Sequence, residues 1–268
     1  MPLAVCATPI GNLEDVTLRV LAELAAADVV LCEDTRHSRV LLERHEIKAR
    51  LLSYHEHNEA QRTAELLPRL EAGERVALVS DAGLPGVSDP GARLVRAALE
   101  AGIEVSVLPG PSAVETALVA SGLVAEQYRF VGFLPRGEKK LAELWDELRD
   151  WPWPVVAFES PHRLAATLRS LAAADPGREA AVCRELTKRF EEVGRGTVRE
   201  LAERYDAPPK GEITLVLGPG AATDDGGEER ALAAVAELVD AGMPRRRAGE
   251  IVSELVGIPR NRLYKQSL

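Results

Sequence analysis

Three turns rich in glycine and proline, each following a run of apolar, β-forming residues, constrain the fold of this chain more than any other feature. They lie at residues 7–12, 80–91 and 108–113. In an open parallel sheet such turns stand at the carboxyl ends of the strands, where ligands bind. Glycine lets the backbone approach a ligand, and proline fixes φ and removes a competing donor. The three turns therefore predict one small-molecule site built largely from main-chain atoms.

The first 110 residues alternate between strand and helix patterns. We expect strands at 3–8, 29–33, 51–55, 76–80 and 104–108, separated by helices at 15–27, 36–46, 58–72 and 92–101. Such alternation predicts parallel strands joined by right-handed crossovers. The fold class is therefore α/β.

After the third turn the pattern changes. We expect helices at 112–121, 138–149, 162–173 and 197–205 and strands at 130–134, 155–159, 180–184, 192–195 and 213–217. Two strands follow each other without a helix between them, which indicates a partly mixed sheet. We predict two α/β domains, at 1–110 and 111–220, with a linker and a helical tail at 221–268.

The tail contains three helical patterns, at 228–241, 245–255 and 259–266. The last two have the spacing of a helix-turn-helix, with Gly257 at the turn and Pro259 opening the second helix. Both RNA docking and a packing or dimerisation role fit this pattern, so both stay open.

Composition indicates a globular protein of the cytoplasm. The chain has 268 residues, of which 46% are hydrophobic, and it has no apolar stretch near the roughly 20 residues that span a bilayer. We expect no signal peptide and no membrane partner. Cys6, Cys32 and Cys183 are far apart within apolar runs, which predicts buried, reduced thiols and no metal site.

The net charge of −9 argues against unspecific coating of nucleic acid, but two segments are basic. Residues 35–50 hold five cations against two acidic residues, and residues 241–268 hold six against two. Local basic faces on an acidic protein suit a structured polyanion. Solvated helix faces explain the same charges, and the charges alone do not separate the two readings.

Charged residues also gather after three strands, at 32–39, 158–163 and 183–189. Helix capping by Asp34 or Thr35, and by Ser160, explains at most one residue in each cluster. It does not explain the cations beside them, and we therefore interpret the clusters as functional. The dinucleotide fingerprint, the phosphate-binding P-loop and the G-x-S-x-G elbow are all absent from the sequence.

These strings resemble a known family. Thr-Pro-Ile-Gly-Asn-Leu-Glu-Asp, the Ser-Asp-Ala-Gly loop and Pro-Gly-Pro-Ser-Ala are similar to the tetrapyrrole methylase superfamily. Cys-Glu-Asp-Thr-Arg-His-Ser, Tyr-His-Glu-His-Asn-Glu, Phe-Glu-Ser-Pro-His-Arg and Arg-Glu-Leu-Thr-Lys resemble one branch, the ribosomal RNA small-subunit methyltransferase I family. The likeness runs from Ala4 to about Gly218. One departure is Ser80-Asp81-Ala82 where the superfamily has Gly-Asp-Pro.

The resemblance implies a homodimer that binds S-adenosylmethionine in a cleft between two α/β domains. It also implies 2′-O-methylation of a cytidine ribose in the decoding region of small-subunit ribosomal RNA, within the assembled subunit. The positions it assigns to the cofactor are Pro9, Ser80, Asp81, Ala82, Gly83, Pro85, Ser112, Ala113, Phe158, Leu186, Gly211, Glu212 and Ile213. A methylase for a tetrapyrrole or other small substrate, and a noncatalytic RNA-binding module, are the alternatives.

A ribose hydroxyl needs its proton taken or shared in the transition state. Glu33 and Asp34 follow the second strand, next to the first turn in this topology, so we expect one of them near the hydroxyl. The alternative is that Asp34 only caps the basic helix. We place Arg36 and Arg39 on the RNA backbone, and Arg163, Lys188 and Arg189 across the cleft.

Overall fold

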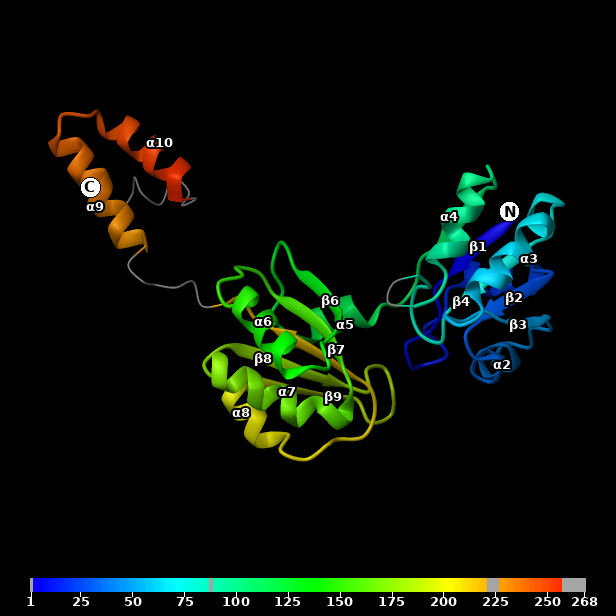
Figure 1. Cartoon of the computed structure of the whole chain (residues 1–268). Coiled ribbons are helices and arrows are strands. Elements are labelled where there is room, and N and C mark those ends of the chain that lie inside the picture. Colours follow the sequence, from blue (N-terminus) through cyan, green and yellow to red (C-terminus); the bar gives the residue numbers. More distant parts are fainter. Residues whose placement is uncertain (1, 87–88, 221–226, 257–268) are drawn as a thin grey trace. The chain divides into compact units, whose positions relative to one another are not determined.

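The computed structural model describes residues 2–86, 89–220 and 227–256 (Figure 1). The chain divides into two units by its packing. The first comprises residues 1–146 and 153–218, and the second comprises residues 147–152 and 219–268.

The first sheet is wholly parallel, with strand order β3-β2-β4-β1-β5. Its strands are β1 (Leu3–Cys6), β2 (Val29–Cys32), β3 (Leu51–Ser53), β4 (Val76–Val79) and β5 (Val105–Leu108). The chain places β2 and β3 on one side of β4 and β1, and β5 on the other. The turns after β1 and β4 therefore lie at the point where the strand order reverses, which is the usual ligand position in such sheets.

Helices cover both faces of this sheet. They are α1 (Leu18–Ala26), α2 (Thr35–Arg44), α3 (Glu59–Glu71) and α4 (Ala92–Glu100). Apolar residues of α1 and α2 share a core with one set of alternating strand residues, and those of α3 and α4 share a core with the other set. Burial on both faces explains why β1, β2 and β4 are continuous apolar runs.

The second sheet is mixed, with strand order β6-β7-β10-β8-β9. Its strands are β6 (Arg129–Phe133), β7 (Val155–Glu159), β8 (Glu179–Arg184), β9 (Glu192–Thr197) and β10 (Ile213–Leu217). Only β6 and β7 pair in parallel, while β10 pairs antiparallel with both β7 and β8, and β8 with β9. The expected mixed sheet is confirmed.

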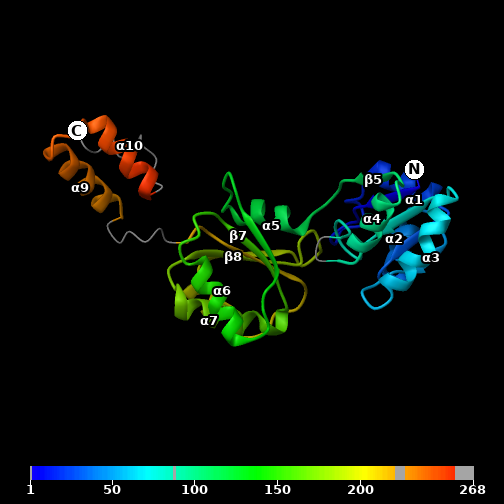
Figure 2. The ribbon, with the colours of Figure 1, turned by 45° about the horizontal axis from the view of Figure 1, so that its top comes forward.

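Four helices accompany the second sheet: α5 (Ala113–Ser121), α6 (Glu138–Leu148), α7 (Pro161–Ala174) and α8 (Val198–Arg204). Val114, Ala117 and Leu118 of α5 pack on one face of the sheet, and Figure 2 shows α6 and α7 on the other face. The two α/β layers of the predicted fold class are therefore present.

Element boundaries differ from the sequence expectations where capping decides them. Helix α1 begins at Leu18 rather than near residue 15, because the Thr17 hydroxyl accepts from the Val20 N–H and caps the helix. Strand β9 reaches Thr197, which then caps α8 through a capping box with Glu200.

The second unit contains α9 (Gly227–Asp240) and α10 (Arg245–Val256), and the two helices pack on each other through Ala231, Val235, Ala248 and Val252. The expected third stretch, 259–266, lies outside the described residues, and so does the turn of the predicted helix-turn-helix. The boundaries 1–110, 111–220 and 221–268 remain a prediction.

The three cysteines are buried free thiols, as expected. Burial raises the pKa of Cys6 and of Cys183 to about 12, so neither is a reactive thiolate. Across the described ranges, no helix is long and apolar enough to traverse a bilayer.

Candidate active site

The first and second turns are joined by main-chain hydrogen bonds. The N–H of Thr8 donates to the Gly83 carbonyl (2.8 Å), and the Gly83 N–H donates back to the Thr8 carbonyl (3.0 Å). The Thr8 hydroxyl also donates to the Ser80 carbonyl at 3.0 Å. Gly83 has a φ of +78°, a backbone conformation that residues other than glycine rarely adopt. The two turns therefore form one fixed main-chain surface.

The Asp81 carboxylate connects the second turn to the loop after β2. It accepts a hydrogen bond from the Asp34 N–H at 3.2 Å, and its Oδ2 lies 3.8 Å from Nδ1 of His37. A small cavity of about 20 Å³ lies between these loops. It is lined by Thr8, Pro9, Leu13, His37, Ser38, Leu41, Ser80 and Asp81.

The third turn lies against the other two. A Cβ placed on Gly110 would come within 2.9 Å of the Ala7 Cβ, and one on Gly83 within 3.6 Å of the Pro111 carbonyl. Ser112 opens α5, and its hydroxyl donates to Glu115, which also accepts from the Tyr128 hydroxyl at 2.5 Å. All three glycine/proline turns of the sequence thus meet at one edge of the first sheet.

One edge of the second sheet collects the other residues assigned to the cofactor. Ile213 pairs with both Glu159 and Arg184, and Thr214 pairs with Phe158. The end of β7, the start of β10 and the end of β8 are therefore adjacent. Leu186 follows β8 directly and is buried. Strand register brings the ends that carry residues 158 and 213 together, and the Glu185 N–H donates to the Glu212 carbonyl at 3.0 Å, which joins the loop containing Leu186 to residues 211–213.

The loop 185–188 has an unusual backbone. Glu185 and Thr187 have φ values of +52° and +64°, although neither is glycine, and a β-branched residue is rarely found there. The Glu185 carboxylate accepts from the Glu212 N–H (3.1 Å) and from Lys188 Nζ (3.0 Å). Lys188 Nζ also donates to the Glu212 carboxylate at 2.8 Å. Strained backbone kept by such a network is typical of functional sites.

The loop 185–188 contacts the first turn. The Asn12 N–H donates to the Thr187 hydroxyl at 2.9 Å. A Cβ on Gly11 would lie 2.5 Å from Lys188 Cγ and 2.8 Å from the Leu186 carbonyl, so only glycine fits there without movement. Ile10 packs with Leu186 in the core beneath α5. Residues from both sheets therefore meet beside the first turn.

Glu33 and Asp34 have different surroundings. Asp34 is the N-cap of α2: its carboxylate accepts from the Arg36 N–H (2.8 Å) and pairs with the Arg36 guanidinium (2.7 Å). These hydrogen bonds lower the pKa of Asp34 to about 2. Burial and the nearby Asp81 carboxylate instead raise the pKa of Glu33. Asp34 is thus engaged as a cap, and Glu33 is the stronger proton acceptor of the two.

The five cations predicted to bind RNA also differ. Arg163 pairs with the buried Glu159 (3.3 Å) and donates to the carbonyls of Leu134 and Pro135, so its donors are used inside the domain. Lys188 is held by the two carboxylates described above. Arg36 pairs with Asp34 but is 90% exposed. Arg39 is exposed on α2, and Arg189 lies over the Phe190 ring at 5.6 Å.

Two further groups, Asp89 near Glu33 and Thr187 beside the first turn, were not singled out from the sequence as site residues. Burial and the carboxylates of Glu33 and Asp81 raise the pKa of Asp89 to about 6. Thr187 was visible only as part of the Arg-Glu-Leu-Thr-Lys string, and its hydrogen bond to Asn12 depends on the tertiary fold. Groups of three or more His, Cys, Asp or Glu side chains suited to a metal do not occur among the described residues.

Comparison with known proteins assigns the chain to a family. Residues 2–202 match the family model of the tetrapyrrole (corrin/porphyrin) methylases. A ribosomal RNA small subunit methyltransferase I from Mesorhizobium japonicum is 47% identical, over 99% of this chain and 91% of that protein. A protein of the same name from a Synechocystis strain is 41% identical, over 99% of this chain and 97% of that protein. The chain belongs to the ribosomal RNA small subunit methyltransferase I family.

Membership of this methylase family makes the chain a methyltransferase and confirms S-adenosylmethionine as the expected cofactor. The fold is also found in a solved uroporphyrin-III C-methyl transferase from Thermus thermophilus complexed with S-adenyl homocysteine. That structure has 21% identity and a TM-score of 0.58, and it covers 81% of this chain and 96% of its own.

Proposed function

We propose that this methyltransferase transfers the methyl group of S-adenosylmethionine to the ribose 2′-hydroxyl of a cytidine in the decoding region of small-subunit ribosomal RNA. The observation that carries the proposal is full-length similarity to relatives named for that RNA, combined with the intact set of three turns. The exposed cations Arg39 and Arg189 favour an anionic polymer as substrate.

We infer that the cofactor binds at the three turns. Its amino-acid part carries an ammonium group, which the Asp81 carboxylate suits, and Gly83 leaves room for close main-chain approach. We assign the donor site to Pro9, Ser80, Asp81, Ala82, Gly83, Pro85, Ser112, Ala113, Phe158, Leu186, Gly211, Glu212 and Ile213. When bound, the cofactor supplies an electrophilic methyl group for in-line displacement, so orientation accounts for much of the rate.

We assign proton acceptance from the 2′-hydroxyl to Glu33. Asp34 has a pKa lowered to about 2 and its oxygens are used by Arg36, whereas the environment of Glu33 raises its pKa. A positioned base typically contributes about 10²–10⁴-fold to the rate. We therefore expect Glu33→Gln to lose most of its turnover while RNA and cofactor binding persist. Asp34→Asn should retain turnover.

The decisive experiment incubates labelled S-adenosylmethionine with undermethylated small ribosomal subunits, with a porphyrinogen as the alternative substrate. We expect label in the ribose of one cytidine, identified by mapping 2′-O-methylation of the RNA. Label only in the porphyrinogen would assign the chain to a small-molecule methylase. Binding of subunits by wild-type protein without any transfer would indicate a noncatalytic RNA-binding module.

We also propose that the active form is a homodimer. Apolar side chains are exposed near the third turn and α5, namely Val107 (54%), Val119 (68%) and Val124 (59%). A second copy of the chain would cover such side chains. Sedimentation velocity of the wild type and of Val119→Glu tests this, because the charged variant should sediment as a monomer.

A further inference from the structure

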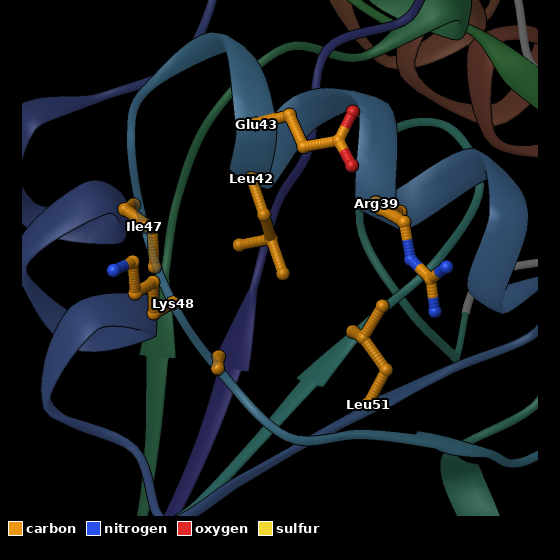
Figure 3. A pocket seen from close by; sticks show the side chains of 7 residues that line it. Arg39, Leu42, Glu43, Ile47, Lys48 and Leu51 are labelled. Carbon is orange, nitrogen blue, oxygen red and sulfur yellow. The ribbon is translucent and has the colours of Figure 1, made fainter.

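A groove beside α2 and the edge strand β3 is not part of the donor site described above. Its volume is about 550 Å³. It is lined by Arg39, Leu42, Glu43, Ile47, Lys48, Ala49 and Leu51. In Figure 3, Leu42 lies between Arg39 on one side and Lys48 on the other, and Leu51 lies below Arg39.

The floor of the groove is apolar and belongs to a packed core. Leu42 is 4% exposed, and Ile47, Ala49 and Leu51 pack against the cluster that contains it. The turn between α2 and β3 fixes this floor: the Ile47 N–H donates to the Leu42 carbonyl at 2.9 Å, with Glu46 at a φ of +55°. This is the hydrogen bond of a Schellman motif, so the groove is preformed.

The cations of the groove differ from a neighbouring cation of α2 in having no partner among the residues that the structure describes. Arg39 and Lys48 are exposed, and within the described ranges neither makes an ion pair or side-chain hydrogen bond. By contrast, Arg44 on the same helix pairs with Glu14 at 2.7 Å. Two unpaired cations beside an apolar floor match a nucleotide, whose phosphate is anionic and whose base and ribose are partly apolar.

The groove lies along α2, the helix that begins at the candidate active site. Helix α2 begins beside Glu33 and Asp34, and Arg39 lies five residues further, about 8 Å along the helix axis. Single-stranded RNA that places a ribose at Glu33 therefore passes Arg39 within a short span of nucleotides.

We propose that this groove binds a nucleotide of single-stranded ribosomal RNA flanking the modified residue, with its phosphates on Arg39 and Lys48 and its base or ribose on the apolar floor. The inference rests on the proposed function and extends it, because it defines how the substrate RNA is held outside the reacting nucleotide. The Glu43 carboxylate stands among the same phosphates and weakens their binding.

Binding of undermethylated small subunits, measured as a function of salt, tests the groove. Arg39→Ala and Lys48→Ala should each weaken binding about three- to tenfold and flatten the plot of log affinity against log salt by about 0.7. At saturating concentrations of subunits, the turnover of these variants should stay near that of the wild type, so KM should rise while kcat changes little. Glu43→Gln should tighten binding about two- to threefold, a gain that misfolding would not produce.

Arg96→Ala is the matched control, because Arg96 is an exposed cation on α4, across the sheet from α2. It should change binding less than twofold. Wild-type affinity in both groove variants would overturn the proposal. A changed oligomeric state in these variants would also overturn it, because the groove would then be a contact between protein chains. Tight, groove-dependent binding of subunits without methyl transfer would instead refute the proposed function and leave the groove intact.

Discussion

At the scale of single residues, the structure separates groups that look alike in the sequence. Glu33 and Asp34 are adjacent carboxylates with different surroundings. Desolvation and the Asp81 carboxylate raise the pKa of Glu33, whereas Asp34 caps α2 and pairs with Arg36. Arg163 and Arg39 are both cations on helices that follow strands, yet Arg163 pairs with buried Glu159 and Arg39 has an exposed side chain. The type of side chain limits the chemistry that a residue can perform. The neighbouring groups in the folded protein set its pKa and decide whether its polar atoms are already paired.

Thr187 offers a sharp test at this scale. Its hydroxyl accepts from the Asn12 N–H and so joins the loop 185–188 to the first turn. Thr187→Val keeps the shape but removes the acceptor, and we expect S-adenosylmethionine to bind about three- to tenfold more weakly, as for loss of one hydrogen bond of about 1 kcal/mol. Thr187→Ser should bind normally. Calorimetric titration measures both, and equal affinity in Val and Ser variants would show that the bond does not organise the site.

Asp89 makes stability depend on pH. Its pKa is raised to about 6 in the folded protein from an ordinary 3.8, so the folded state binds its proton more tightly than the unfolded state. This contribution to stability is complete below about pH 4 and is lost as pH rises through 6. Asp89→Asn should therefore stabilise the protein by about 1 kcal/mol at pH 7, since partial solvation reduces the full effect, and should be neutral at pH 3.5. Denaturant unfolding at the two pH values measures the difference, and an equal effect at both would contradict it.

At the scale of elements, short local rules set the positions of the functional loops. The N-cap at Asp34 starts α2 directly after β2 and so holds Glu33 at the sheet edge. The Schellman turn at Glu46 ends α2 and shapes the groove floor. Capping and turn residues therefore place the candidate base and the candidate RNA groove at opposite ends of one helix.

Replacing the α2 cap tests this arrangement. Asn caps helices about as well as Asp, whereas Ala does not. Asp34→Ala should lower the melting temperature by about 2–4 °C, and Asp34→Asn by much less. Differential scanning calorimetry of the two variants compares them directly. An Asn variant as unstable as the Ala variant would mean that the ion pair with Arg36, not the cap, is what matters.

At the scale of the whole molecule, the cores of the two sheets and the core of the C-terminal helices are separate. The clusters of the two sheets use residues between Leu3 and Val216, whereas α9 and α10 form a small cluster of their own. The Gly220 N–H donates to the Trp151 carbonyl, so a truncation that preserves this bond must retain Gly220.

A chain ending at Gly220 is therefore expected to keep the fold of both sheets. Its affinity for S-adenosylmethionine should stay within about twofold of the full chain. If the tail docks on RNA, subunit binding should weaken and its salt dependence should flatten. Titration calorimetry and salt-dependent subunit binding measure the two effects. A joint loss of thermal stability and cofactor affinity would show that the tail completes the fold instead.

The sequence by itself determined the order of strands and helices, the three turns at strand ends and the family. These features depend on periodicity, on glycine and proline, and on residues within a few positions of each other. The tertiary structure decided that the pKa of Glu33 is raised while that of Asp34 is lowered, that Arg163 and Lys188 pair inside the domain, and that Thr187 meets Asn12. Those outcomes depend on strand order and on contacts between residues up to 175 positions apart, as for Asn12 and Thr187. Local pattern carries no information about which distant group a side chain will reach.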